Sequence, residues 1–350
     1  MSKNKIATGL TKSFGKPSSL KFISTGCTLL NLAVSQRWDG GWARGRIVNL
    51  VGDGSSGKTL LALRACASVF YDVKDVKKKY IVYNNVEGVM DFDIALLFGQ
   101  EFADAIIWES SSTCEKFGRN YMQWLQKLKK GEFLLYVGDS LDSMVSSKQK
   151  ERTLESIKTD KDEKGSYGEK AKYFSASLFN NLCSMMQDKD ATLICISQVR
   201  EKINVMFGEK YYRAGGKALD FYTHQVVWLA EKNKMDKSYK GFKNIIGTRI
   251  KAYVKRNKVS KAFRRCDFRI LFDYGIDDIE SCIDFVYGEK DKGFFTWPLK
   301  EGKSLEFCRE ELVEYLENKP KAFQRLRQFV SDKWHKIERK TMPNRKPQFR

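Results

Sequence analysis

Eight consecutive residues form a complete phosphate-binding loop of the pattern G-x-x-x-x-G-K-[ST]: Gly52, Asp53, Gly54, Ser55, Ser56, Gly57, Lys58 and Thr59. The apolar, β-branched run at residues 45–51 predicts a buried strand before the loop, and residues 60–70 predict a helix after it. In this order, backbone N–H groups and a helix N-terminus can surround phosphate oxygens. The sequence therefore predicts a nucleoside triphosphate site, in which Lys58 reaches the β- and γ-phosphates and the Thr59 hydroxyl binds Mg²⁺.

Three further expected strands end in residues suited to the same site. Residues 133–140 form an apolar run that ends in an acid, a Walker B pattern in which Asp139 holds Mg²⁺ through water. Glu87 lies at the end of a second strand, where a carboxylate can orient and deprotonate an attacking water. Gln198 ends a third strand, at residues 191–198, and its amide is suited to contact a γ-phosphate.

Composition limits the class of protein. The chain has 350 residues, 42% of them hydrophobic, which is enough for one large α/β domain and a smaller one. No run approaches the roughly eighteen apolar residues of a membrane span, and no signal-peptide core follows Met1. We therefore expect a cytoplasmic protein without a membrane partner. The eight cysteines include no C-x-x-C pair and there are only two histidines, which argues against structural zinc.

The charge favours a polyanionic partner. Lysine and arginine number 63 against 43 acids, a formal net charge of +20. Such an excess favours nucleic acid over membrane, because no basic amphipathic anchor is present. A lysine-rich proteome would produce the same excess, so the charge does not decide the partner by itself.

Expected strands and helices alternate along the chain. Strands are predicted at residues 20–24, 80–84 and 105–108, and helices at residues 24–33, 91–98, 114–130 and 170–186. One apolar stripe at helical spacing is expected in the core rather than at a cofactor: Phe117, Tyr121, Trp124 and Leu128. Two C-terminal helices are expected to close a small apolar core through Leu312, Val313, Leu316, Phe323, Leu326, Val330, Trp334 and Ile337.

Two segments interrupt this pattern. Residues 146–168 are polar and charged, and we expect them to be mobile. Residues 199–217 mix basic side chains, aromatic rings and glycines without a sustained helical or strand period. Basic groups can hold phosphates while apolar side chains stack on bases, so the second segment is a candidate for nucleic-acid binding.

These residues together resemble the bacterial RecA-type recombinases, including phage-encoded relatives. Shared features are Ile23-Ser24-Thr25-Gly26, Gly45-Arg46-Ile47-Val48 and the phosphate loop. The most specific is Gln198-Val199-Arg200 with Lys202-Ile203 and Val205-Met206-Phe207-Gly208, followed by Gly215-Gly216 and Ala218-Leu219. The match continues through residues 254–258 and 270–276, and it covers roughly residues 23–288.

The resemblance implies a RecA-like P-loop ATPase core, a twisted, mostly parallel sheet flanked by helices, with a small C-terminal α+β domain. It assigns residues 1–24 to an N-terminal segment that contacts an adjacent subunit, 25–288 to the core, 289–338 to the C-terminal domain and 339–350 to a basic tail. Two DNA-binding loops are expected at about residues 146–168 and 199–217.

The resemblance also implies roles for single residues. Glu87 is the catalytic carboxylate, Lys58 and Thr59 hold phosphate and metal, Asp139 is the Walker B acid, and Gln198 links the γ-phosphate to DNA. Arg256 and Lys258 match a basic pair that reaches the ATP of a neighbouring subunit, and Asp91 and Phe272 align with adenine contacts. The implied DNA-binding residues are Tyr167, Lys172, Arg200, Lys202, Ile203, Met206, Phe207, Gly215 and Gly216. The basic side chains of Arg213 and Lys217 in the same segment are also expected to hold DNA phosphates.

The chain departs from the family pattern at several places. Its N-terminal segment is short, Gly54 stands where relatives usually carry Glu, and Asn85 stands where they usually carry Asp. Ile94 replaces an aromatic residue that contacts the base, and the stretch before Tyr167 is longer than usual. The tail at residues 339–350 holds five basic residues and no acidic side chain, where the family's tail is typically acidic.

We therefore expect an ATP- and Mg²⁺-dependent recombinase that forms a head-to-tail helical filament on single-stranded DNA and pairs it with a homologous duplex. Two alternatives use the same sequence features. One is a ring-forming helicase or translocase on the same core. The other is an ATP-gated protein that coats single-stranded DNA without strand exchange.

Overall fold

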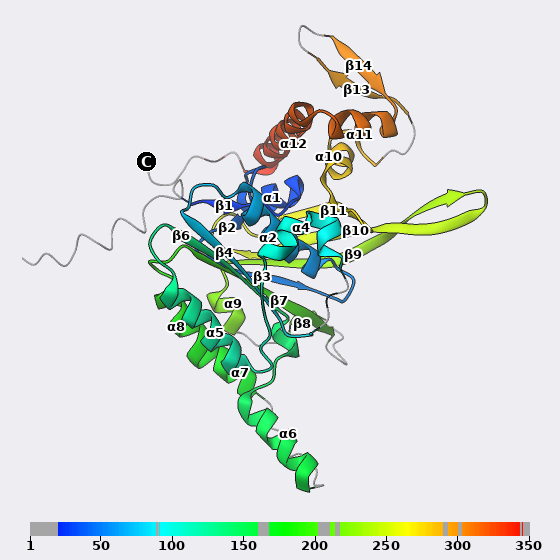
Figure 1. The fold of residues 1–350 in the computed structure, drawn as a ribbon. Helices are drawn as coiled ribbons and strands as arrows, with labels where there is room; N and C mark the ends of the chain where they lie inside the picture. Colours follow the sequence, from blue (N-terminus) through cyan, green and yellow to red (C-terminus); the bar gives the residue numbers. More distant parts are fainter. Residues whose placement is uncertain are drawn as a thin grey trace, which may run out of the picture.

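The computed structural model of the chain describes residues 20–88, 90, 92–159, 168–201, 211–213, 218–289, 293–299, 303–343 and 345. Its largest element is a ten-stranded sheet with helices on both faces (Figure 1). The strand order is β12-β11-β10-β9-β3-β7-β6-β4-β5, and β8 pairs with β7. The predicted class, an α/β core with a mostly parallel sheet flanked by helices, is confirmed. Within the described ranges, no helix is long and apolar enough to cross a membrane.

Parallel strands bring their ends to one edge of this sheet. β3 (Ile47–Gly52) lies between β7 (Ala191–Glu201) and β9 (Gln225–Tyr239), and β6 (Glu132–Asp139), β4 (Lys78–Asn85) and β5 (Ile107–Glu109) extend the sheet beyond β7. Every residue of β3 is buried, as expected for a strand covered on both faces. The register places Gly52 beside Gln198 and Leu229, and Asn85 beside Asp139. The phosphate loop and the ends of β4, β6 and β7 therefore share one edge.

The other half of the sheet is antiparallel and contains a long hairpin. β9 turns into β10 (Phe242–Asn257), which pairs with β11 (Arg265–Leu271), and β12 (Gly275–Asp277) follows. Lys240 and Gly241 form the turn, with φ of 48° and 83°, the positive pair that a two-residue hairpin turn requires. Beyond the pairing with β3 and β11, the hairpin continues as a two-stranded ribbon that projects from the body (Figure 1).

Two apolar clusters fill the space between the sheet and the helices. On one face lie α1 (Thr28–Ser35), α2 (Lys58–Asp72), α4 (Gln100–Ala105) and α10 (Asp278–Tyr287). On the other lie α5 (Cys114–Lys127), α7 (Glu169–Tyr173), a π-helix (Phe174–Leu178), α8 (Phe179–Met185) and α9 (Ala218–Tyr222). The predicted core role of the aromatic stripe on α5 is confirmed, since Phe117, Tyr121 and Leu128 are buried and Trp124 packs against them.

The C-terminal part packs on the same cluster as α1 and α2. β13 (Phe295–Pro298) pairs with β14 (Ser304–Phe307), and α11 (Arg309–Glu317) and α12 (Pro320–Thr341) follow. Leu312, Leu326 and Val330 are fully buried, so both predicted helices are confirmed. Their core is continuous with the main one rather than separate. Ile337 is 46% exposed and does not belong to it.

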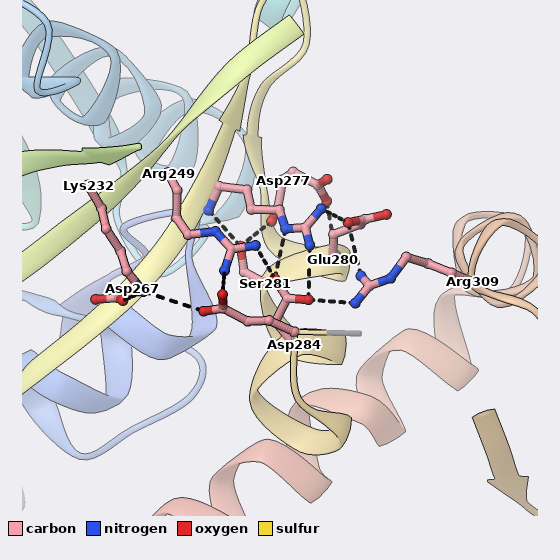
Figure 2. Close-up of polar contacts among 10 residues, drawn as sticks. Lys232, Arg249, Asp267, Asp277, Glu280, Ser281, Asp284 and Arg309 are labelled. Atoms are coloured by element: carbon pink, nitrogen blue, oxygen red, sulfur yellow. Dashed lines mark hydrogen bonds and ion pairs between the residues drawn. The ribbon is translucent and has the colours of Figure 1, made fainter. Parts of the chain in front are cut away.

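An ionic network joins the sheet to the C-terminal helices. Asp284 on α10 accepts hydrogen bonds from Arg249 of β10 at 3.1 Å, Arg269 of β11 at 2.7 Å and Arg309 of α11 at 2.6 Å (Figure 2). Glu280, one turn earlier on α10, pairs with Arg309 at 3.0 Å and also with Arg269. Four elements thus meet at one largely buried carboxylate.

Several local expectations are wrong. Residues 147–159 form a helix, α6 (Ser147–Thr159), rather than a mobile stretch; most of them are strong helix formers, and none is buried. β7 runs on to Glu201, and β8 (Tyr211–Arg213) pairs with it antiparallel, so the ends of the second candidate DNA loop are strands.

The strand expected at residues 105–108 begins at Ile107, because Ala105 ends α4. α3 (Ile94–Phe98) begins after Asp93, whose side chain accepts the Leu96 N–H at 2.8 Å. The strand expected at residues 20–24 is only β1 (Phe22–Ile23), paired with β2 (Trp42–Ala43).

Candidate functional site

The phosphate loop leaves the sheet at Gly52 and enters α2 at Lys58. A Cβ on Gly52 would lie 2.7 Å from the Leu229 carbonyl oxygen of the neighbouring strand, so this position has room only for glycine. Gly57 has φ of +80°, a left-handed conformation in which glycine is unstrained. The two glycines let the backbone turn sharply between β3 and α2, as a phosphate-cradling loop must.

Lys58 is folded back onto the loop that precedes it. Its ammonium group donates to the Asp53 carbonyl oxygen, and Ser56 Oγ lies 3.5 Å away. Lys58 is only 7% exposed, and burial lowers the pKa of its ammonium group, while the charges of Asp53, Asp139 and Glu87 oppose that shift. The Lys58 ammonium group therefore lies within the phosphate loop, and Lys58 lines the adjoining cavity.

Thr59 and Asp139 meet as the sequence predicts for a metal site. Thr59 Oγ1 donates to Asp139 Oδ2 at 2.9 Å, and the Tyr83 hydroxyl donates to the same oxygen at 2.6 Å. Burial raises the pKa of Asp139, and the two hydrogen bonds counteract the shift. One carboxylate and one hydroxyl, completed by phosphates and water, form the donor set that Mg²⁺ takes in nucleotide sites. Among the described residues, no group of three or more acidic, histidine or cysteine side chains offers a different metal site.

Glu87 lies at the rim of this site and is held by two serines. Ser140 Oγ donates to Glu87 Oε1 at 2.9 Å, and Ser143 Oγ donates to the same oxygen at 3.0 Å. Asn85 accepts the Gly88 N–H at 3.1 Å and so orders the turn that carries Glu87. An aspartate at position 85 could accept that bond equally, so the Asn85 departure leaves this contact available.

A cavity of about 700 Å³ opens between the phosphate loop and the hairpin. Its wall includes residues of the loop with Glu87 and Asp139, and the apolar side chains of Met90, Phe92, Leu96, Leu97 and Phe272. This size and this polar–apolar division suit a nucleotide. Phe272 is 56% exposed, so its ring is accessible to a base. Asp91, the other residue expected at adenine, lies outside the described residues.

The hairpin contributes residues to the cavity wall that the sequence did not single out: Glu231, Lys234 and Thr248. The register shifts between Arg249 and Ile250, so that Ile250 pairs with Glu231 and Arg249 with Asn233. The extra residue in β9, a β-bulge, turns Glu231 and Lys234 to the same face of the strand. Ser140, Ser143 and Tyr83 were likewise missed, although both serines closely follow the Walker B acid.

Gln198 lies beside the loop but not in the cavity wall. It is neighbour to Gly52 in the sheet, its side chain is exposed, and its backbone N–H donates to Asp142 Oδ2 at 2.6 Å. The structure therefore places Gln198 at the predicted edge, with its backbone anchored to the turn that follows Asp139.

Arg256 and Lys258 lie at the opposite edge of the sheet. Asn257, between them, pairs with Gln225, which lies beside Val48 near the start of β3. Thr248 of the same strand lines the cavity, and nine residues of strand span about 30 Å. Burial, followed by the charge of Arg256, lowers the pKa of Lys258, whose ammonium group donates to the Phe221 carbonyl. This pair does not reach the cavity of its own chain.

The residues predicted to bind DNA fall largely outside the described ranges. This is so for Tyr167, Lys202, Ile203, Met206, Phe207, Gly215, Gly216 and Lys217. Lys172 is exposed on α7. Arg200 pairs with Tyr212, and Arg213 with Val199, in the β7–β8 ladder that brackets residues 202–210.

Comparison with known proteins gives the family. The family model of the RecA N-terminal domain matches residues 7–277. Protein RecA of Mycoplasma genitalium is 29% identical over 90% of this chain and 86% of its own length. Protein RecA of Chlamydia trachomatis serovar L2 is 31% identical over 87% and 82%, and that of Nostoc sp. is 25% identical over 93% and 87%. The chain belongs to the RecA family.

Proposed function

We propose that the chain is an ATP-dependent DNA recombinase. It binds ATP with Mg²⁺ in the cavity, assembles head to tail on single-stranded DNA and pairs that strand with a homologous duplex. Hydrolysis of ATP is stimulated by DNA. The observation that carries the proposal is the meeting of Lys58, the Thr59–Asp139 pair and Glu87 around one cavity in a chain of this family.

In this proposal the phosphate loop binds the nucleotide through its backbone N–H groups and through Lys58. Thr59 and Asp139 hold Mg²⁺, which would supply charge to the β- and γ-phosphates. Tyr83 orients Asp139, since its hydroxyl occupies the same oxygen that Thr59 contacts. Phe272 and the other apolar side chains of the cavity wall receive the adenine ring. Asp91 is assigned to the base by family resemblance alone.

Glu87 is the general base for the attacking water. Two serine hydroxyls donate to its Oε1, which leaves Oε2 for the water and keeps the carboxylate at the cavity rim. A negatively charged acceptor within reach of a water is what proton abstraction requires. Gln198 is assigned to γ-phosphate sensing, a role that requires its exposed side chain to turn toward the nucleotide.

Arg256 and Lys258 complete the site of a neighbouring subunit. They lie at the edge of the sheet opposite the phosphate loop, so a head-to-tail contact would bring one subunit's pair to the next subunit's cavity. Positive charge delivered from outside stabilises the transferring phosphoryl group in the manner of an arginine finger. DNA is assigned to the basic and apolar residues of the two candidate loops.

The hydrolytic role is tested by charge-removing substitutions. Glu87→Gln should retain ATP binding and lose turnover by about 10²-fold or more, because the amide cannot accept the proton. Lys58→Ala should lose both binding and turnover, and Glu101→Gln, an exposed acid on α4, should change neither. Steady-state ATPase with ssDNA and calorimetric ATP binding measure these outcomes. Full turnover in Glu87→Gln would show that Glu87 is not the general base.

Strand-exchange assays separate the proposal from its alternatives. A recombinase forms joints that depend on homology, a helicase unwinds duplex without homology, and a coating protein does neither. Phe207→Ala should impair exchange more than ATP binding, since base stacking contributes about 1–3 kcal/mol per base. Wild-type exchange by this variant would move the DNA site away from residues 199–217.

A further inference from the structure

The turn at residues 140–144, here called the coupling turn, touches both the candidate base and the flanks of both candidate DNA loops. It follows Asp139 and contains the short 3₁₀ helix Leu141–Ser143. Leu141 and Met144 are each only 1% exposed and anchor it in the apolar cluster under α5. These two apolar side chains anchor the coupling turn, and its polar groups contact three different partners.

The first partner is Glu87. Ser140 and Ser143 each donate to Glu87 Oε1, and their own hydroxyl oxygens lie 2.9 Å apart. A movement of the coupling turn would thus move or release the carboxylate.

The second partner is Lys170, near the start of α7. Its ammonium group donates to the carbonyl oxygens of Asp142 and Met144, each at 2.9 Å, and lies 3.5 Å from that of Leu141. One cation therefore gathers three carbonyls of the coupling turn. Lys170 follows Tyr167, assigned to the first DNA loop, by three positions.

The third partner is the backbone of β7. Asp142 Oδ2 accepts the Gln198 N–H at 2.6 Å, a charge-assisted hydrogen bond at the point where β7 leaves the sheet. Gln198 precedes Lys202, assigned to the second DNA loop, by four positions. Lys170 thus ties the coupling turn to the flank of the first candidate DNA loop, and Asp142 ties it to the flank of the second.

We propose that Lys170 and Asp142 are positioning residues that couple DNA binding to hydrolysis through the coupling turn. The inference rests on the proposed function and deepens it. DNA bound next to Lys170 and to the end of β7 would hold these two flanks and, through them, the coupling turn, so that Ser140 and Ser143 keep Glu87 in its working position.

The test compares ATPase turnover with and without saturating ssDNA. Lys170→Met and Asp142→Ala should each lower the ratio of DNA-stimulated to basal kcat by about tenfold, within the usual range of coupling between sites. Their ATP affinity should stay at the wild-type value. Asp142→Asn should recover most of the ratio, because its amide oxygen still accepts the Gln198 N–H. Lys333→Met, which removes a lysine bound to the Phe285 and Val286 carbonyls, should leave the ratio unchanged.

Three results would overturn the inference. One is a wild-type stimulation ratio in both Lys170→Met and Asp142→Ala. Another is an equal fall in basal and stimulated kcat, which a merely structural turn would produce; thermal melts and the milder Lys170→Arg variant check that the fold is kept. The last is a wild-type chain that binds no nucleotide or shows no DNA stimulation, which overturns the proposed function itself and with it the coupling.

Discussion

His224 is a neutral histidine at the edge of the sheet that carries Arg256 and Lys258. Its Nδ1 accepts the Ile47 N–H at 3.2 Å. Burial, followed by the charges of Arg46, Lys258 and Arg256, lowers its pKa from 6.5 to about 4. Between these two pH values the unfolded chain binds the proton more readily than the folded one. The stability contributed by neutral His224 is therefore fully present above pH 6.5 and is lost as the pH falls toward 4.

We expect His224→Asn to remove this pH dependence while keeping an acceptor for the Ile47 N–H. The measurement is the free energy of unfolding of both proteins from pH 7.5 to 4, and the difference between them isolates His224. The subtraction is needed because burial raises the pKa of Asp277 to about 6, which makes stability fall as the pH rises from 3.8 to 6. Parallel curves for the two proteins would contradict the expected shift.

At the residue scale, the sequence predicted the groups that belong to a local motif. The phosphate loop with Thr59 was found because its G-x-x-x-x-G-K-[ST] spacing is fixed by the chemistry of phosphate binding, and Asp139 was found because it ends an apolar run. Glu231 and Lys234 were not, because they face the cavity only through a one-residue register shift in β9. No short sequence pattern reveals such a bulge.

At the element scale, Asp284 is the residue on which three arginines from three elements converge (Figure 2). Its side chain is 11% exposed, so little water can replace a lost partner. Asp284→Asn should lower the free energy of unfolding by about 3 kcal/mol or more, since it leaves buried guanidinium groups short of countercharge. Urea denaturation measures this loss.

The matched control is Asp236→Asn on the projecting hairpin. Asp236 pairs with Lys243 at 3.2 Å, and both side chains are exposed, so its loss should cost under about 1 kcal/mol. Equal effects of the two substitutions would mean that the network around Asp284 does not hold the C-terminal helices to the sheet.

Elements with an apolar period were predicted well, and polar ones were not. α5, β6 and β7 follow from buried stripes or runs, because burial leaves a periodic trace in the sequence. α6 has no buried residue, so its polar composition was interpreted as mobile although its residues favour a helix. β8 has only three residues and pairs with the end of β7, a tertiary contact without a local signal.

At the scale of the whole molecule, the cavity and the basic pair lie at opposite edges, which predicts complementation between inactive variants. Glu87→Gln subunits keep an intact basic pair, and Arg256→Ala/Lys258→Ala subunits keep an intact Glu87. In an equal random mixture, about a quarter of the head-to-tail interfaces should combine both intact halves. We expect about that fraction of wild-type ATPase activity on ssDNA, where each variant alone has almost none.

Electron microscopy of the mixture must show filaments that contain both variants. Mixed filaments without recovered activity at any ratio would mean that Arg256 and Lys258 do not act at the cavity of a neighbouring subunit. Recovery without filaments would favour a closed ring, the geometry of the helicase alternative.

In the proposed head-to-tail assembly each edge of the sheet carries half of a site, so the two ends of any open row of subunits are unlike. In a head-to-tail row of n subunits only n − 1 cavities meet a partner's Arg256 and Lys258; the cavity at one terminus and the basic pair at the other stay unmatched. A single subunit then has no complete site, a pair has one, and turnover per subunit rises with length toward a plateau. Nucleotide exchange and subunit loss would be governed by the terminus whose cavity is open, so growth and shrinkage would have a direction set by the sheet itself.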